Sequence, residues 1–175
     1  MARIRKFAAY RRLERPYTRF SKFRNKSFIR ALPHMLLNKF NMGDKAKKFS
    51  YKVELLAKNP VHIRHNAIES ARMTTNRYLE KNLGKKEYFF TIRIYPFHVL
   101  RENPLASGAG ADRMSTGMKK SFGKPISRAA QIKKGQVLLE VNVNKSNIQV
   151  GRDALDRAKH KLPCSCSVKV TPLKK

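Results

Sequence analysis

The chain has 175 residues, and its 41% hydrophobic content supports one domain with a modest core and excludes a fully disordered protein. Its 40 Lys and Arg residues against 11 Asp and Glu residues give a formal net charge of +29. The acidic residues are too few to balance such a surface, so we expect a polyanionic partner. The basic residues are scattered along the chain, which favours nucleic acid over a membrane surface.

No segment has the length and apolar character of a membrane span. Residues 1–30 lack the apolar region and the cleavage site of a secretory signal. Their Arg-rich, acid-poor composition is also typical of a mitochondrial transit peptide, which stays open as an alternative. Cys164 and Cys166 are separated by one residue, a spacing that does not suit an ordinary disulfide. It agrees with a reducing cytoplasm, so we expect a cytoplasmic protein.

Residues 1–30 alternate basic and aromatic side chains, and neither the helical nor the strand period persists. We predict a basic arm that is poorly ordered alone. On RNA its guanidinium groups would contact phosphates and its rings would stack on bases, while some rings pack on the arm's own domain. The arm residues expected to bind RNA are Arg3, Arg5, Arg11, Arg12, Arg15, Tyr17, Arg19, Arg24 and Arg30.

The remaining sequence predicts a single α+β domain over residues 31–170 and a short basic tail at 171–175. Apolar runs and alternations predict strands at residues 35–41, 51–57, 87–95, 97–101, 128–132, 137–143 and 166–170. Helical spacing of apolar residues predicts helices over 66–83 and 148–161. Tight turns outnumber regular crossovers in this order, which favours a mostly antiparallel sheet with two helices.

Local signals predict where some of these elements begin and end. Asn66 followed by Glu69 resembles a capping box at the start of the first long helix, and Gly84 suits the position after its end. The sequence KKGQ at 133–136 predicts a hairpin turn between the two strands that flank it.

The segment 101–125 lies between two β-rich runs and contains four of the chain's eight glycines. It lacks apolar periodicity, and loops of this length inside a domain are usually functional or disordered. Glycine also lets a partner approach the backbone closely. Basic side chains add charge: Arg101, Arg113, Lys119, Lys120 and Lys124. We predict that loop 102–125 is a flexible basic finger, held by two strands, that contacts a polyanion.

The glycines also raise the alternative of a nucleotide site. Gly108 and Gly110 lack the third glycine of a dinucleotide fingerprint. Residues 117–125 differ from a P-loop by one extra residue and by Pro125 where the magnesium-binding Ser or Thr belongs. These departures argue against an enzyme, and no catalytic residues or cofactor are expected.

Metal binding is a further alternative, with Cys164, Cys166, His160, His62 and His65 as the candidate ligands. One C-x-C with one nearby His lacks the paired spacing of a structural zinc site. We therefore expect no metal site, and we expect the two cysteines to pack as small apolar residues.

Residues 110–125, GADRMSTGMKKSFGKP, preceded by YPFHVLR at 95–101, resemble the signature of a universal family of large-subunit ribosomal proteins. The family is called L-sixteen in bacteria and L-ten-e in archaea and eukaryotes. Shorter resemblances occur in order over residues 14–162, at RPYTR 15–19, FIRALP 28–33, FNMG 40–43, AIESAR 67–72 and GQVL 135–138. Ala31 and Lys119 depart from the archaeal and eukaryotic branch, which often has Gly and Arg there. The sequence lacks the C-terminal extension of eukaryotic relatives, so we expect an archaeal-like member.

The resemblance implies an α/β hammerhead-like fold and a structural, non-catalytic role in the large ribosomal subunit. It implies binding to large-subunit rRNA near the 5S rRNA, contact with neighbouring ribosomal proteins, and help in positioning tRNA near the peptidyl-transferase centre. No membrane contact and no self-association are expected. It implies that the finger's base is held on rRNA by Arg101, Arg113, Lys120 and Lys124. The tRNA-side residues that it implies are Leu105, Ala106, Ser107, Gly108, Ala109, Gly110, Ala111, Asp112, Met114, Ser115, Thr116, Gly117, Met118 and Lys119.

Two other hypotheses stay open on the sequence. One is a ribosome-associated RNA chaperone or translation factor that binds RNA transiently. The other is a nucleotide-dependent enzyme that uses the glycine-rich loop.

Overall fold

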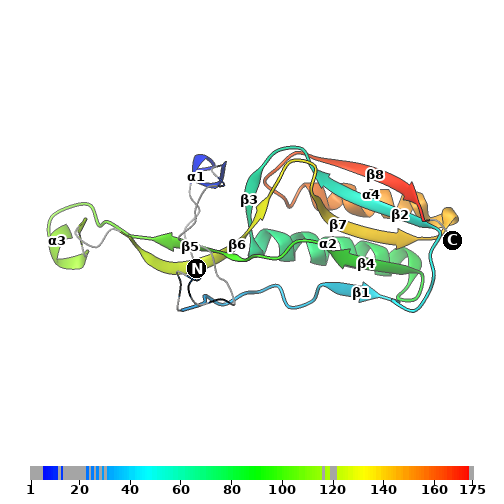
Figure 1. Cartoon of the computed structure of the whole chain (residues 1–175), viewed down its shortest axis with the longest axis horizontal. Coiled ribbons are helices and arrows are strands. Elements are labelled where there is room, and N and C mark those ends of the chain that lie inside the picture. Colours follow the sequence, from blue (N-terminus) through cyan, green and yellow to red (C-terminus); the bar gives the residue numbers. More distant parts are fainter. Residues whose placement is uncertain are drawn as a thin grey trace.

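The computed structural model describes residues 6–11, 13, 23, 25, 27, 29, 31–115, 117–118 and 122–173. This part of the chain forms two antiparallel sheets and two long helices, which confirms the predicted α+β class. Figure 1 shows a thick body at one end of the molecule and a narrow projection at the other.

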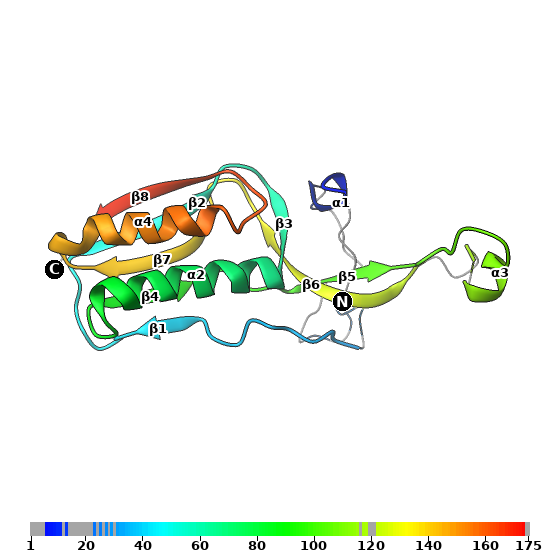
Figure 2. The same ribbon diagram turned by 180° about the vertical axis from the view of Figure 1, so that it is seen from behind.

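A five-stranded sheet with the order β1-β4-β7-β2-β8 forms the body. Helices α2 (His65–Leu83) and α4 (Ile148–Lys159) cover one face of it, as the opposite views in Figures 1 and 2 show. The strands are β1 (Asn41–Gly43), β2 (Tyr51–Ala57), β4 (Tyr88–Ile92), β7 (Val137–Val143) and β8 (Cys166–Pro172). A sheet covered on one face buries every second side chain of a strand, and this alternation of burial is clear in β2 and β4.

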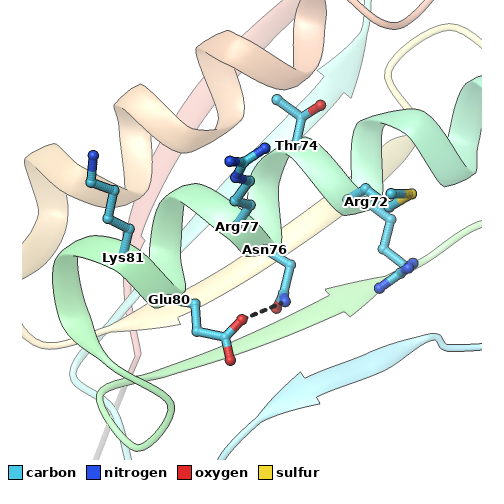
Figure 3. Close-up of a pocket in the computed structure, with 7 residues that line it drawn as sticks. Arg72, Thr74, Asn76, Arg77, Glu80 and Lys81 are labelled. Carbon is cyan, nitrogen blue, oxygen red and sulfur yellow. Dashed lines mark hydrogen bonds between the residues drawn. The ribbon is translucent and has the colours of Figure 1, made fainter.

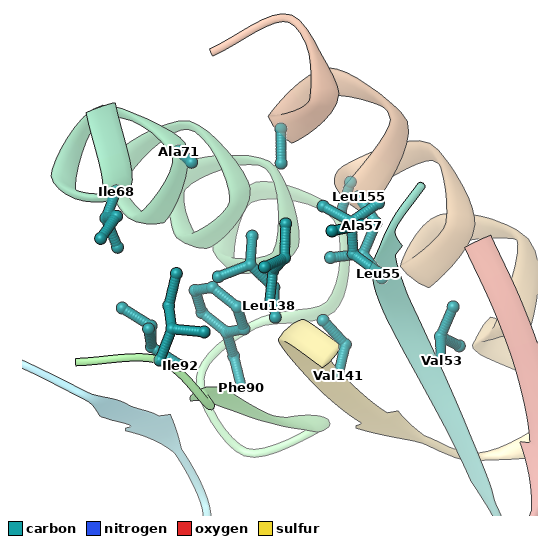
Figure 4. Packing of buried hydrophobic residues seen from close by; sticks show 14 of the residues in the cluster. Val53, Leu55, Ala57, Ile68, Ala71, Phe90, Ile92, Leu138, Val141 and Leu155 are labelled. Carbon is teal, nitrogen blue, oxygen red and sulfur yellow. The ribbon is translucent and has the colours of Figure 1, made fainter. Parts of the chain in front are cut away.

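The main core lies between this sheet and the two helices. In Figure 4 side chains from β2, β4 and β7, such as Leu55, Phe90 and Val141, point toward α2 and α4. Gly151 lets α4 approach the sheet closely, because a Cβ there would lie 3.3 Å from a methyl carbon of Val53.

Helix α2 buries the face that the sequence predicts and ends where Gly84 predicts. Its buried residues are Ile68, Ala71, Thr75 and Leu79. Gly84 has φ 75° and its N–H donates to the carbonyl oxygen of Glu80. The glycine thus supplies the positive φ at which the helix ends.

The predicted capping box is wrong. The helix begins at His65, and its N-cap residue Arg64 makes no side-chain capping bond. The Asn66 side chain accepts a hydrogen bond from the next N–H, that of Ala67, at 3.2 Å. Glu69 pairs with Arg72 at 2.6 Å, since a full positive charge is a stronger partner than a backbone N–H.

A second, three-stranded sheet has the order β3-β6-β5 and carries the projection. Its strands are β3 (Val61–Arg64), β5 (His98–Glu102) and β6 (Lys124–Ile132). Strand β3 was not predicted, because its four residues follow Pro60 directly and run into α2 without a break. The predicted strand 87–95 stops at Ile92, and His98 begins a strand of this other sheet.

The predicted hairpin at 133–136 is also wrong. The turn exists, with the N–H of Lys133 donating to Oε1 of Gln136 at 2.9 Å. The strands on its two sides, β6 and β7, belong to different sheets and do not pair. The turn is bonded instead to the end of β2, where Ala57 accepts from the Gly135 N–H at 2.8 Å and donates to Gln136 O at 3.0 Å.

The predicted strand 35–41 is mostly wrong, since β1 covers only Asn41–Gly43. Leu37 is fully buried, while Leu32 and Leu36 are exposed, so this segment contributes single side chains to the core. The N–H of Leu36 donates to Nδ1 of His65 and is therefore unavailable to a neighbouring strand.

The other described elements are short: α1 (Ala8–Arg11), α3 (Ala111–Met114) and the 3-10 helix η3 (Lys145–Asn147). Within the described part of the chain, no helix combines the length and the apolar character needed to cross a bilayer.

Replacing Phe90 by Ala should lower the free energy of unfolding by about 3–5 kcal/mol, because it leaves a cavity between the sheet and the helices. Phe90 is 0% exposed. Met73→Ala on the exposed face of α2, where Met73 is 58% exposed, should change it by only about 0.5 kcal/mol or less. Chemical denaturation measures both, and equal losses would contradict this core.

Candidate nucleic-acid interface

The finger consists of β5, β6 and the loop 103–123 between them, and it projects away from the body (Figure 1). Strands β5 and β6 pair antiparallel, from His98 opposite Ala129 to Glu102 opposite Lys124. The two strands that flank the loop therefore hold each other, as the sequence predicts. Glu102 and Lys124 are an opposite-charge pair at the point where the strands end.

Side chains at this point close the neck of the loop. Nη1 of Arg101 donates to the carbonyl oxygen of Gly123 at 2.8 Å, and its guanidinium carbon lies 4.0 Å from the centre of the Phe122 ring. Nδ2 of Asn103 donates to the carbonyl oxygen of Gly117 at 3.2 Å. Gly123 has φ +80°, and a Cβ there would lie 2.9 Å from the backbone of Glu102. Only glycine allows the two strands this approach.

Beyond the neck the loop is open to solvent. Residues 104–110 are all exposed, and so are Met114 (87%) and Met118 (68%). Helix α3 is a single turn, begun by Gly110 in the left-handed conformation and closed by the Ser115 hydroxyl on Ala111 O at 2.9 Å. The tip therefore has local hydrogen bonds and a surface that is open to a partner.

The structure brings together part of the predicted site. Arg101 and Lys124 lie at the neck, Arg113 is exposed on α3, and Arg11 ends α1. The tip residues with described side chains, all at least partly exposed, are Leu105, Ala106, Ser107, Gly108, Ala109, Gly110, Ala111, Met114, Ser115, Gly117 and Met118. Asp112 lies in α3, and its side chain is outside the described part. Predicted residues outside the described ones are Arg3, Arg5, Arg12, Arg15, Tyr17, Arg19, Arg24, Arg30, Thr116, Lys119 and Lys120.

Most acidic side chains of the body pair with basic neighbours. The ion pairs are Lys47 with Glu87, Lys52 with Glu54, Arg72 with Glu69, Lys85 with Glu80, Arg93 with Glu140, and Lys159 with Asp156. These carboxylates lie in the five-stranded sheet, in the two helices that cover it, or next to these elements. The three-stranded sheet instead contains four Lys and Arg residues and one acidic residue, Glu102. Positive charge is therefore concentrated on the sheet that carries the finger.

Arg128 of β6 is part of this charge, and its role could not be predicted from the sequence. It is only 6% exposed. Its Nε donates to the carbonyl oxygen of Pro96 and its Nη2 to the hydroxyl of Tyr95, both at 3.2 Å. Both acceptors are neutral, so these bonds solvate the guanidinium without cancelling its charge. A spacing rule could not have identified it, because only the fold brings Tyr95 and Pro96 against β6.

His65, at the start of α2, responds to the same charge. Burial lowers its pKa below the ordinary value, and the positive charges of Arg64, Arg128 and His34 lower it further. The neutral ring accepts the N–H of Leu36 at 3.3 Å through Nδ1. His65, a candidate metal ligand on the sequence, is thus a neutral packing residue in a cationic region.

A groove of about 570 Å³ follows the outer face of α2 (Figure 3). Arg77 and Lys81 project outward along it, and Nδ2 of Asn76 donates to Glu80 at 3.3 Å. The hydroxyl of Tyr88 donates to Oδ1 of Asn76 at 2.8 Å. Burial, with the nearby Glu80 charge, raises the pKa of Tyr88 to about 12, so this hydroxyl stays protonated. The groove is a second, weaker basic surface, because Glu80 offsets part of its charge.

The described residues contain no cluster of three or more His, Cys, Asp or Glu that could hold a metal. Cys164 and Cys166 are free thiols whose sulfur atoms lie 3.6 Å apart. The hydrogen bond from Cys166 lowers the pKa of Cys164, while the same contact and burial raise that of Cys166.

Residues 14–169 match the model of the family described as Ribosomal protein L16p/L10e. The chain is 41% identical to "Large ribosomal subunit protein uL16" of Methanococcus maripaludis strain C7 over 169 residues, which cover 96% of this chain and 94% of the relative. It is 42% identical over 159 residues to the protein of the same name in Hyperthermus butylicus, covering 91% of this chain and 85% of the relative.

Gly123→Ala should displace the neck of the finger, because the new Cβ would overlap the backbone of Glu102. Gly108→Ala is the matched control, since Gly108 also has a positive φ but a Cβ there would meet nothing within 4 Å. We expect limited proteolysis to cut the loop at least several times faster in Gly123→Ala than in Gly108→Ala. Equal rates would show that strand approach at Gly123 does not hold the finger.

The lowered pKa of His65 makes stability depend on pH. The unfolded chain binds the proton at an ordinary pKa of about 6.5, whereas the folded chain resists it. The stability contributed by the neutral His65 ring is therefore fully present above the pKa of the unfolded chain. It is lost as the pH falls through the lower pKa of the folded chain. NMR titration of the ring should give a midpoint below about 6.5, and His65→Gln should reduce the loss of stability between pH 7 and 5. A midpoint above the ordinary value would contradict the cationic environment.

Proposed function

The chain belongs to the Ribosomal protein L16p/L10e family, and on this basis we propose that it is a structural, non-enzymatic component of the large ribosomal subunit. Relatives that match nearly its whole length bear the name of a large-subunit protein. A net charge of +29 suits a chain whose partner is rRNA. Ribosomes of the cytoplasm are the expected location.

We propose that rRNA binds three parts of the chain. The first is the arm over residues 1–30, whose arginines and Tyr17 would contact phosphates and bases. The second is the neck of the finger, where Arg101, Arg113, Lys120 and Lys124 would fix its base. The third is the basic tail at 171–175. The domain over 31–170 supplies the framework that places these charges, and the internal ion pairs of the body leave its acidic groups little power to repel phosphate.

We further propose that the tip of the finger, Leu105 to Lys119, helps to position tRNA near the peptidyl-transferase centre. The observation that supports this most is an exposed tip on a neck that is closed by Arg101 and Gly123. A closed neck fixes the direction of the loop, while the open tip can fit a partner. We place the protein near the 5S rRNA and beside other large-subunit proteins, with no membrane contact and no self-association.

Deleting residues 106–118 tests the role of the tip. None of the described side chains in this segment is buried, so the melting temperature should change little. The shortened chain should still join large subunits, and translation by those subunits should fall at least severalfold. A shortened chain that fails to fold would show that the finger belongs to the core, and normal translation would exclude a role at tRNA.

The competing hypothesis is an RNA chaperone or translation factor that binds transiently. Sedimentation of large subunits at rising salt separates the two, because a component embedded through many phosphate contacts dissociates at higher salt than a loosely bound factor. We expect the chain to remain with subunits at salt concentrations that remove translation factors from the same preparation. Dissociation together with those factors would favour the competing hypothesis.

A further inference from the structure

A cavity of about 620 Å³ lies where the arm meets the body, separate from the finger tip. Its walls come from α1, β3, the first turns of α2, and the residues that follow α4. This volume is within the range of about 300–1,000 Å³ typical of sites for small ligands. We propose that it binds one unpaired rRNA nucleotide, extruded from its helix, with its base against Phe7 and Tyr10 and its phosphate against Arg64 and Lys161.

The charge of the walls points to an anion. Arg64 and Lys161 line the cavity together with His62 and His160, and its described lining includes no acidic residue. A metal cation is excluded by the same charges, because it would lie among like charges with no carboxylate or thiolate in that lining to offset them.

Two aromatic rings point to a base as the apolar part of the ligand. Phe7 and Tyr10 are three residues apart in and just before α1, a spacing that places two side chains on the same side of a helical turn. Phe7 is 44% exposed, although the guanidinium carbon of Arg11 lies 4.9 Å from the centre of its ring, and Tyr10 packs partly on the core. The pair therefore offers the ring surface that Arg11 and the core leave uncovered. RNA-binding proteins use such rings to stack splayed bases.

Four segments line the cavity, so a ligand in it would contact the arm and the body together. Its volume suits one nucleotide, and RNA-binding proteins read unpaired bases one at a time by stacking them on aromatic rings. The arm wall is attached to the body, since α1 contacts β3 and Nε2 of Gln131 donates to the carbonyl oxygen of Leu13 at 2.5 Å. Binding a nucleotide here would therefore also fix the arm on the three-stranded sheet.

Photochemical cross-linking with mass spectrometry, on purified large subunits that contain the full chain, tests where the nucleotide lies. This test rests on the proposed ribosomal function. We expect Phe7 or Tyr10 to cross-link to one rRNA position. Cross-links from other residues of the arm or from the finger, with none from Phe7 or Tyr10, would overturn the cavity site and leave the ribosomal role intact. Absence of the chain from large subunits would instead overturn the ribosomal role itself.

Variants test the contacts separately, using large subunits stripped of their own copy by high salt. Phe7→Leu with Tyr10→Leu keeps apolar bulk but removes the rings, and should weaken binding about 5- to 150-fold, the range for one stacked base. Phe7→Tyr alone should bind as the unchanged chain does. Free adenosine monophosphate serves as a second probe, and we expect binding at least about tenfold weaker than that of the RNA site because one phosphate replaces a connected strand.

Arg64→Gln with Lys161→Gln should lower the slope of log affinity against log salt by about 1.4, as expected for two phosphates of a single strand. Arg152→Gln with Lys169→Gln removes the same charge from exposed positions on α4 and β8 and is the matched control. If the two double variants lowered the slope equally, the effect would come from net charge alone, and the site would be overturned. If the Arg64 variant has a lowered melting temperature, Lys161→Gln alone still tests the site, because Lys161 is exposed and its replacement should not disturb the fold.

Discussion

Strand β6 is the element on which the rest of the structure depends, because it belongs to the core and to the finger at once. It pairs with β3 through Ala129 to Ile132 and with β5 through Lys124 to Ala129. Its body end is buried, at Ala129, Ala130 and Ile132, and its far end is exposed at Lys124. The pairing of β5 with β6 shifts register between Leu100 and Arg101, and from Leu100 it runs without a shift to Ala129 at the buried end. The direction of the finger is set by the same hydrogen bonds that hold the three-stranded sheet together.

The two sheets that this arrangement connects also differ in charge. The five-stranded sheet and its helices contain acidic residues and use them in ion pairs, so that part of the chain folds without strong self-repulsion. The three-stranded sheet has one acidic residue, Glu102, and its buried Arg128 donates to a carbonyl and a hydroxyl. A buried charge bonded to neutral groups costs stability unless dipoles or a partner compensate for it. Burial lowers the pKa of His65, and the nearby positive charges of this region lower it further. RNA phosphate is the partner of opposite sign.

Much of the fold follows from sequence patterns where one physical rule acts alone. Residues 51–57 alternate, and β2 covers Tyr51–Ala57; Gly84 ends α2 because no other residue fits its φ as readily. The prediction failed where distant contacts decided the outcome. At 133–136 the turn signal was right, but bonds to Ala57 send the chain into another sheet. At Leu36 a histidine of α2 takes the N–H that a strand would have used.

The two candidate sites differ in how much of each the sequence predicts. Glycines and basic residues identified the finger from the sequence, because a basic loop without apolar periodicity has nothing to bury in a core and can contact a polyanion. The cavity between arm and body could not be identified, since Phe7, Arg64 and Lys161 come together only through the packing of α1, β3 and the end of α4. The contrast has a physical origin. An exposed tip can be predicted from local composition alone, because it consists of small residues and of methionines whose side chains adapt to a partner. The walls of the cavity come from separate elements, and they meet only once the sheets and helices have packed.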